Sequence, residues 1–135
     1  MIEKIDHIGV VVKNMEEAVE NYRDIGFKVE CEELLKETKL KVAFLPVGET
    51  YIELLEPAVM KKDEVTELDM SKEGIHHIAI RVANIDDEIE KLKESGIELL
   101  PYYKKPRRGA RGARIVFINP KYTSQGLLEL VERRE

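Results

Sequence analysis

The chain has 135 residues, a length that suits one compact domain. Charged residues make up 36% of it, and its formal net charge of −5 argues against non-specific nucleic-acid binding, because such binding needs a basic surface. No run approaches the roughly 20 apolar residues that a membrane-spanning helix requires, and a single cysteine, Cys31, excludes an internal disulfide. A strand-like run begins almost at Met1 with no signal-peptide pattern, so we expect a cytoplasmic protein.

The first half of the chain predicts one strand, one helix and three further strands. Residues 5–12 are rich in Val and Ile, as is typical of a strand. Asn14, with Glu17 three residues later, has the pattern of a helix N-cap, and Gly26 has that of a helix end. These signals predict a helix over 15–25. Strands are expected at 27–34, 40–46 and 50–56.

The second half repeats this order of elements. A strand is expected at 76–82, and Asn84 begins a helix over 85–95 that Gly96 ends. Three more strands are expected at 97–102, 112–118 and 127–132. The offset between the two copies is 70 residues at His7 and His77, and it widens to 76 at Glu53 and Glu129.

Two βαβββ modules therefore make up the predicted domain, which spans residues 1–135 with modules at about 1–70 and 71–135. A four-stranded sheet with one helix covers only one of its faces, so the other face must pack or curl around something. We expect an α+β fold in which the two modules form one curved mixed sheet around a cavity.

Four side chains should converge in that cavity, because side chains alternate between the faces of a strand. This alternation turns His7 and His77 away from their aliphatic neighbours, and it does the same for Glu53 and Glu129. A single histidine at a strand start is more often structural than a ligand, but two in register across a repeat, with glutamates in register as well, favour a metal site. Buried carboxylates also need a partner. His76 is expected to face the other way and is interpreted as structural.

The predicted ligand set is thus His7, Glu53, His77 and Glu129 around one divalent metal ion. Two imidazoles and two carboxylates suit Co²⁺, Ni²⁺, Zn²⁺ or Mn²⁺. In a six-coordinate ion, two positions would stay open for water or a bidentate substrate, which is a catalytic rather than a structural arrangement.

The loop 104–114 holds six basic residues and no acidic one in a chain that is acidic overall. Such a loop can simply be a solvated charged segment. It can also bind the phosphate or carboxylate of an anionic substrate, and Arg107, Arg108 and Arg111 are then the candidate contacts. Glu37 lies in the segment before the expected strand at 40–46, where nothing in its spacing distinguishes it from other exposed acids.

Several segments together resemble the methylmalonyl-CoA epimerase family of the vicinal-oxygen-chelate (glyoxalase/bleomycin-resistance/dioxygenase) superfamily. They are DHIG at 6–9, VAFLPVG at 42–48, IELLEP at 52–57, GIHHIA at 74–79 and PRRG at 106–109. The resemblance implies the same four metal ligands, and it implies a catalytic glutamate at Glu37. Thr38 and Lys39 replace the Gln-Gly usual in the family, and Asn119 stands where members often have histidine.

What the resemblance implies for activity is the epimerisation of (2R)- and (2S)-methylmalonyl-CoA. Glu37 and Glu129 would remove and return the α-proton through a metal-stabilised enolate, with Co²⁺ as the expected metal and Mn²⁺, Ni²⁺ or Zn²⁺ as alternatives. A homodimer, an acyl-CoA substrate and a role in propionate metabolism are implied as well. The alternatives are a glyoxalase I-type lactoylglutathione lyase and a non-catalytic small-molecule-binding protein of the superfamily.

Overall fold

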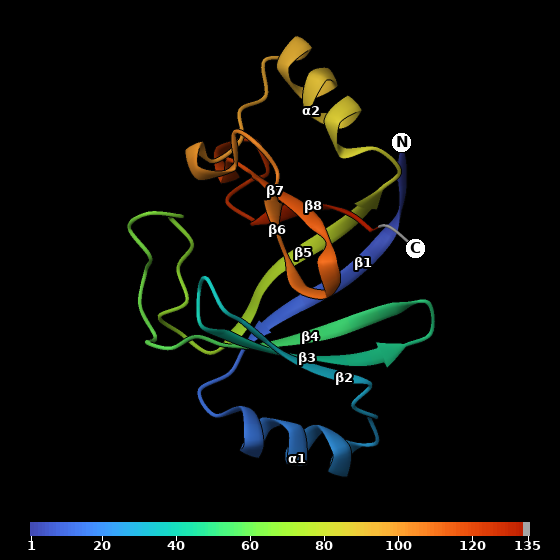
Figure 1. Ribbon diagram of the computed structural model, residues 1–135, viewed down its shortest axis with the longest axis vertical. Helices are drawn as coiled ribbons and strands as arrows, with labels where there is room; N and C mark the ends of the chain where they lie inside the picture. The colour runs from blue at the N-terminus through green and yellow to red at the C-terminus, as the bar shows by residue number, and fades with distance from the viewer. Residues whose placement is uncertain (134–135) are drawn as a thin grey trace.

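The computed structural model describes residues 1–133 of the chain, and their strands form one strongly curved eight-stranded sheet (Figure 1). The order across the sheet is β2-β3-β4-β1-β5-β8-β7-β6. The elements are β1 (Ile2–Val11), α1 (Met15–Ile25), β2 (Cys31–Leu35), β3 (Leu40–Val47), β4 (Thr50–Glu56), β5 (Gly74–Val82), α2 (Ile85–Glu94), β6 (Arg107–Arg108), β7 (Arg114–Ile118) and β8 (Leu128–Glu132), with short 3₁₀ turns at Pro101–Tyr103, Ala110–Gly112 and Pro120–Tyr122.

The two expected modules are present, and they join through their first strands. In each module the first strand pairs in parallel with the last, β1 with β4 and β5 with β8. β1 and β5 then pair with each other in antiparallel orientation at the centre of the sheet. The curved mixed sheet predicted from the repeat is confirmed. Among the described residues, no helix is long and apolar enough to cross a membrane.

The helices begin where the sequence predicts, because side chains satisfy their first backbone N–H groups. The Asn14 side chain accepts from Glu17 N at 3.0 Å, and the Asn84 side chain accepts from Asp87 N at 3.1 Å. The last strand of each module adds a second acceptor, since Glu56 and Glu132 carboxylates accept from the first helical residues Met15 and Ile85. Each helix is thereby fixed to the end of its own module's last strand.

Each helix packs on the convex face of its own half of the sheet. Met15 and Val19 of α1 lie in one buried apolar cluster with Ala43, Leu45 and Leu54. Ile85 and Ile89 of α2 lie in another with Val82, Val116 and Leu130 among others. Figure 1 shows the helices at opposite ends of the molecule with β1 and β5 running side by side between them. The concave face is left free for the cavity.

β-Bulges interrupt the pairing of β1 with β5. Ile5 pairs with Ile80 and His7 with Ala79, so that Asp6 is an extra residue on β1. Gly9 pairs with His77 and Val10 with Ile75, so that His76 is an extra residue on β5. A bulge changes the direction in which side chains point. Strict alternation therefore fails at the residue immediately before each central histidine.

The strand expected at 97–102 is wrong. Only Leu99 makes an isolated bridge, to Ile118, and the chain then turns into a 3₁₀ helix at Pro101–Tyr103. Proline has no N–H to donate to a neighbouring strand and is pre-shaped for the first position of a helical turn. The sheet edge is formed instead by the two-residue strand β6, which pairs with β7 through Arg107 and Arg108.

Candidate metal centre

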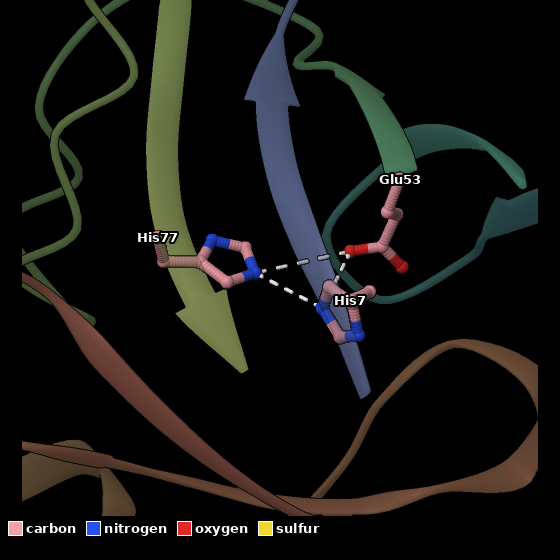
Figure 2. A group of neighbouring side chains, drawn as sticks. All are labelled: His7, Glu53 and His77. Carbon is pink, nitrogen blue, oxygen red and sulfur yellow. Dashed lines mark hydrogen bonds and ion pairs between the residues drawn. The ribbon is translucent and has the colours of Figure 1, made fainter. Parts of the chain in front are cut away.

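The four predicted ligands converge on the concave face, one from each of the adjacent strands β4, β1, β5 and β8. His7 Nε2 and His77 Nε2 lie 3.1 Å apart. Glu53 Oε1 lies 3.2 Å from the first nitrogen and 3.9 Å from the second. Glu129 Oε1 lies 3.0 Å and 3.4 Å from the same two atoms. Figure 2 shows His7, His77 and Glu53 pointing toward one another from three strands.

All four residues are buried, with no more than 6% of any of them exposed. Ligand atoms of His7, Glu53 and His77 lie within 4.8 Å of one another, close enough to share one ion. Among the described residues, the buried Glu129 Oε1 lies beside the two histidine nitrogens and has no other hydrogen-bond donor. Two neutral imidazoles and two carboxylates carry two negative charges, which a divalent cation balances. The donor atoms of His7, Glu53 and His77 therefore fit one divalent metal ion, and Glu129 Oε1, beside both imidazoles, is the fourth candidate ligand.

The electrostatics of the cluster favour a cation at this position. Burial lowers the pKa of His7, but the charge of Glu53 and hydrogen bonds to Asp6, Glu129 and Glu53 outweigh it and raise the pKa to about 12. Burial raises the pKa of Glu129, but the positive charge of His77 and hydrogen bonds from both histidines lower it to about 2. In the absence of metal, a proton on His7 supplies positive charge to the buried carboxylates.

A cavity of about 380 Å³ opens beside the four residues. Apolar side chains form much of its wall, including Leu40, Val42, Leu55 and Val131. Glu37 also lines this cavity from the turn between β2 and β3, and its side chain is exposed. The candidate acid–base residue and the candidate ligands thus face one space, although Glu37 comes from a turn and the ligands come from strands.

The basic loop divides between two cavities. Arg107 and Arg108 line the cavity beside the histidines. The Arg107 guanidinium stacks over the Tyr102 ring at 3.8 Å from its centroid, and its Nε donates to Tyr102 O. Arg111 instead lines a second cavity with Lys4, Arg81 and Arg133, and its guanidinium lies over the rings of Phe44 and Tyr51.

Residues that the sequence did not single out complete the first cavity. The connection between β4 and β5 contributes one wall, through Ala58, Lys61, Thr66 and Met70 among others. Its irregular sequence carries no periodic signal. Tyr103 is buried in the cavity wall, and burial followed by the charge of Glu129 raises its pKa well above its usual range, so its hydroxyl stays protonated. The hydroxyl is therefore a hydrogen-bond donor in the working pH range.

Comparison with known proteins gives one matching family model and several relatives that align with nearly the whole chain. Residues 6–117 match the family model for the glyoxalase/bleomycin resistance protein/dioxygenase superfamily. An uncharacterized protein of Bacillus subtilis, YqjC, is 32% identical over 130 residues, covering 96% of this chain and 91% of that one. Mitochondrial methylmalonyl-CoA epimerase of Mus musculus is 33% identical over 129 residues, covering 94% and 71%.

A solved structure has the same fold. It is a methylmalonyl-CoA epimerase in complex with methylmalonyl-CoA and NH4⁺. The two chains superpose with a TM-score of 0.83 at 34% sequence identity, and the match covers 98% of this chain and 95% of that one.

Gly9 is required for the position of His77. A Cβ at residue 9 would lie 2.3 Å from His77 Cε1 and 2.7 Å from Nε2. Because a ring at the end of a side chain moves more easily than backbone, we expect Gly9→Ala to change the free energy of unfolding by less than about 1 kcal/mol. We expect affinity for Zn²⁺ to fall by at least about tenfold, because the ring of His77 is displaced.

Thermal unfolding measures the change in stability of Gly9→Ala, and competition with a chelating dye measures its Zn²⁺ affinity. Gly126→Ala, where the Cβ finds ordinary space at 3.4 Å, should change neither, and full affinity in Gly9→Ala would contradict this role.

Metal binding should depend on pH. Since the pKa of His7 is raised to about 12 in the metal-free cluster, the ring is protonated at neutral pH and a metal must displace that proton. A protonated ligand competes with the metal, so the apparent affinity should rise with pH, by about tenfold per unit for one proton. Zn²⁺ titrations between pH 6 and 8 measure the slope. An affinity independent of pH in this range would show that His7 is already neutral.

Proposed function

The chain belongs to the glyoxalase/bleomycin resistance protein/dioxygenase superfamily, and we propose that it is a metal-dependent methylmalonyl-CoA epimerase acting as a single domain over residues 1–135. The observation that carries the proposal is the convergence of four buried ligand atoms beside a cavity that Glu37 also lines. Its similarity to methylmalonyl-CoA epimerases over nearly the whole chain supports the substrate.

His7, Glu53, His77 and Glu129 would hold the ion, which we propose to be Co²⁺, with Mn²⁺, Ni²⁺ and Zn²⁺ as alternatives. When bound, such an ion supplies Lewis acidity that stabilises the negative charge developing on a thioester oxygen. The protein supplies the fixed geometry. Each ligand lies on a hydrogen-bonded strand near the centre of the sheet, and rigid elements hold ligands more accurately than loops do.

The proton transfers are assigned to Glu37 and Glu129. The α-carbon of methylmalonyl-CoA carries an acidic proton between a thioester and a carboxylate. Epimerisation requires a base on one face of that carbon and an acid on the other. Glu37 belongs to the first module and Glu129 to the second, and both line the cavity. The low pKa of Glu129 keeps it as a carboxylate, which is the form that accepts a proton.

The acyl group is proposed to occupy the cavity, and the coenzyme A portion to extend from it along the basic loop. A volume of about 380 Å³ suits a short branched acyl group rather than the whole thioester. Arg107 and Arg108 border the same cavity and provide cations for phosphates or the free carboxylate. Because Arg111 lines the other cavity, we assign it no substrate contact.

A second copy of the chain is proposed to cover the convex face between the two helices. Ile8 pairs with Ile52 on one side and with Ile78 on the other, and Ile78 pairs with Leu128. These four side chains form one apolar row across four strands, and Ile78 at its centre is 41% exposed. The repeat makes the row nearly symmetric, as a twofold interface requires. We place the homodimer in the cytoplasm and in propionate metabolism.

Replacing Glu37 tests the acid–base assignment. In Glu37→Gln the amide cannot take up the α-proton, so we expect deuterium incorporation from solvent into methylmalonyl-CoA to slow by about 10²- to 10⁴-fold. The metal content should stay at the wild-type level because Glu37 lies outside the ligand set. Incorporation is followed by mass spectrometry for each epimer. Glu32→Gln, an exposed change on β2, is the matched control.

Undiminished exchange in Glu37→Gln would remove that residue from the mechanism. The same preparations should be assayed with the hemithioacetal of methylglyoxal and glutathione. Activity there without epimerisation would favour a lactoylglutathione lyase, and the absence of both activities in metal-loaded protein would favour a non-catalytic binding role.

The proposed dimer predicts that Ile78→Lys weakens self-association. A lysine at the centre of the apolar row would place two charges in the interface without partners. Sedimentation velocity should then give a monomer at concentrations where the wild type is a dimer. Ile25→Lys, at an exposed position on α1 outside the row, should leave the dimer intact. A wild-type monomer at about 100 μM would refute the interface, because stable homodimers persist far below that concentration.

A further inference from the structure

We propose that Asp6 and His76 are positioning residues for the metal centre, each brought by a β-bulge against Nδ1 of the ligand histidine that follows it. The inference rests on the proposed function, because it presumes that His7 and His77 bind metal through Nε2. Each contact is between neighbours in sequence, and the two pairs occupy equivalent positions in the two modules. The proposed role is to direct each Nε2 lone pair toward the metal.

Asp6 holds the His7 ring through a short contact of 2.7 Å between Oδ2 and Nδ1. An ionised carboxylate can only accept, so Nδ1 carries the proton and the lone pair of a neutral ring is on Nε2. The guanidinium groups of Arg81 and Arg133 each lie 2.9 Å from the Asp6 carboxylate and offset its charge. The carboxylate therefore stays ionised although its side chain is wholly buried.

Two guanidinium groups fix the orientation of the Asp6 carboxylate. Arg133 donates from Nε to Oδ1 and from its terminal nitrogen to Oδ2, each at 2.9 Å. Arg81 donates from Nε to Oδ1 at 3.0 Å. Arg133 also donates to the backbone oxygen of Ala110 at 3.1 Å, which ties the carboxylate to the turn before β7. The orientation of His7 thus depends on contacts from β1, β5 and the C-terminal end of β8.

His76 occupies the corresponding place behind His77. The two Nδ1 atoms lie 2.7 Å apart, and the rings meet edge to face with centroids at 5.0 Å. One proton must lie between these nitrogens, since two lone pairs would repel each other and two protons would clash. If His77 Nε2 is to face the metal, its Nδ1 carries that proton and His76 accepts it. His76 Nε2 is then an N–H, and it is buried without a partner among the described residues.

The two positioning residues differ in charge. The carboxylate behind His7 makes that imidazole a stronger donor, whereas the neutral ring behind His77 only orients it. The loss of Asp6 should therefore weaken metal binding more than the loss of His76. A purely structural role for either residue predicts lower stability without this order of affinities.

Metal affinity tests the proposal directly. We expect Asp6→Asn to lower the affinity for Zn²⁺ and Co²⁺ by about 10- to 100-fold, since the asparagine amide can donate to Nδ1 and favour the wrong tautomer. His76→Phe keeps an aromatic ring, slightly larger than imidazole, but removes the acceptor, and should lower the affinity by a smaller factor. Asp24→Asn, the same charge change at an exposed position on α1, should bind as the wild type does. Competition with a chelating dye measures all three.

Nuclear magnetic resonance of the Zn²⁺-loaded protein supplies a second readout. In the wild type, the Nδ1 protons of His7 and His77 should both resonate at low field because both are hydrogen-bonded. His76→Phe should shift the His77 proton alone, and Asp6→Asn the His7 proton alone. A structural role would not move these signals separately. Circular dichroism confirms that each variant is folded, and if Asp6→Asn does not fold, His76→Phe decides the question.

The outcomes separate this inference from the proposed function. One Zn²⁺ per wild-type chain, with unchanged affinity and unchanged Nδ1 signals in both variants, would overturn the positioning roles and leave the metal site standing. No Zn²⁺ or Co²⁺ binding by the wild type would overturn both. Reduced affinity in the stated order, with selective loss of the matching signal, would establish the roles.

Discussion

Antiparallel pairing of β1 with β5 is the contact on which the rest of the molecule depends. It joins two modules that each cover only one face of their sheet, and it places their first strands at the centre of a single curved sheet. The same pairing sets Gly9 opposite His77 and His7 opposite Ala79. Small residues opposite the rings allow the two Nε2 atoms to approach within 3.1 Å. The register of β1 against β5 therefore determines both the fold and the geometry of the candidate metal centre.

The charged groups around the two histidines favour a cation at the centre. Glu53 and Glu129 are buried beside the two histidines, at a cost that only a nearby positive charge can offset. Behind His7, Asp6 faces Arg81 and Arg133, so this outer layer carries one negative and two positive charges. Negative charge at the centre thus lies on the carboxylates of Glu53 and Glu129, and the layer behind His7 carries a net positive charge. This separation favours a divalent cation at the centre over a compact set of ion pairs.

Much of the fold and the convergence of the candidate site were predictable from the sequence. The repeat and strand alternation identified His7, His77, Glu53 and Glu129, because alternation holds between each of them and the aliphatic residue that follows it. The strand expected at 97–102 was wrong because of Pro101, since a proline can start a helical turn but has no N–H to donate to a neighbouring strand. Glu37 required the family resemblance, because a turn residue has no periodic signal. Asp6 and His76 were missed as partners of the histidines because bulges break the alternation that the prediction assumed.

The residues preceding the two histidines carry a consequence for how such a protein can diverge. A centre assembled from two identical modules would have the same side chain behind both rings, and any change there would act twice. Covalent fusion of the modules removes that restriction, so that Asp6 and His76 can differ while His7 and His77 remain alike. The chain therefore keeps a symmetric set of donors with unequal electronic support. The two halves can therefore change independently of each other around one shared set of inward-facing side chains.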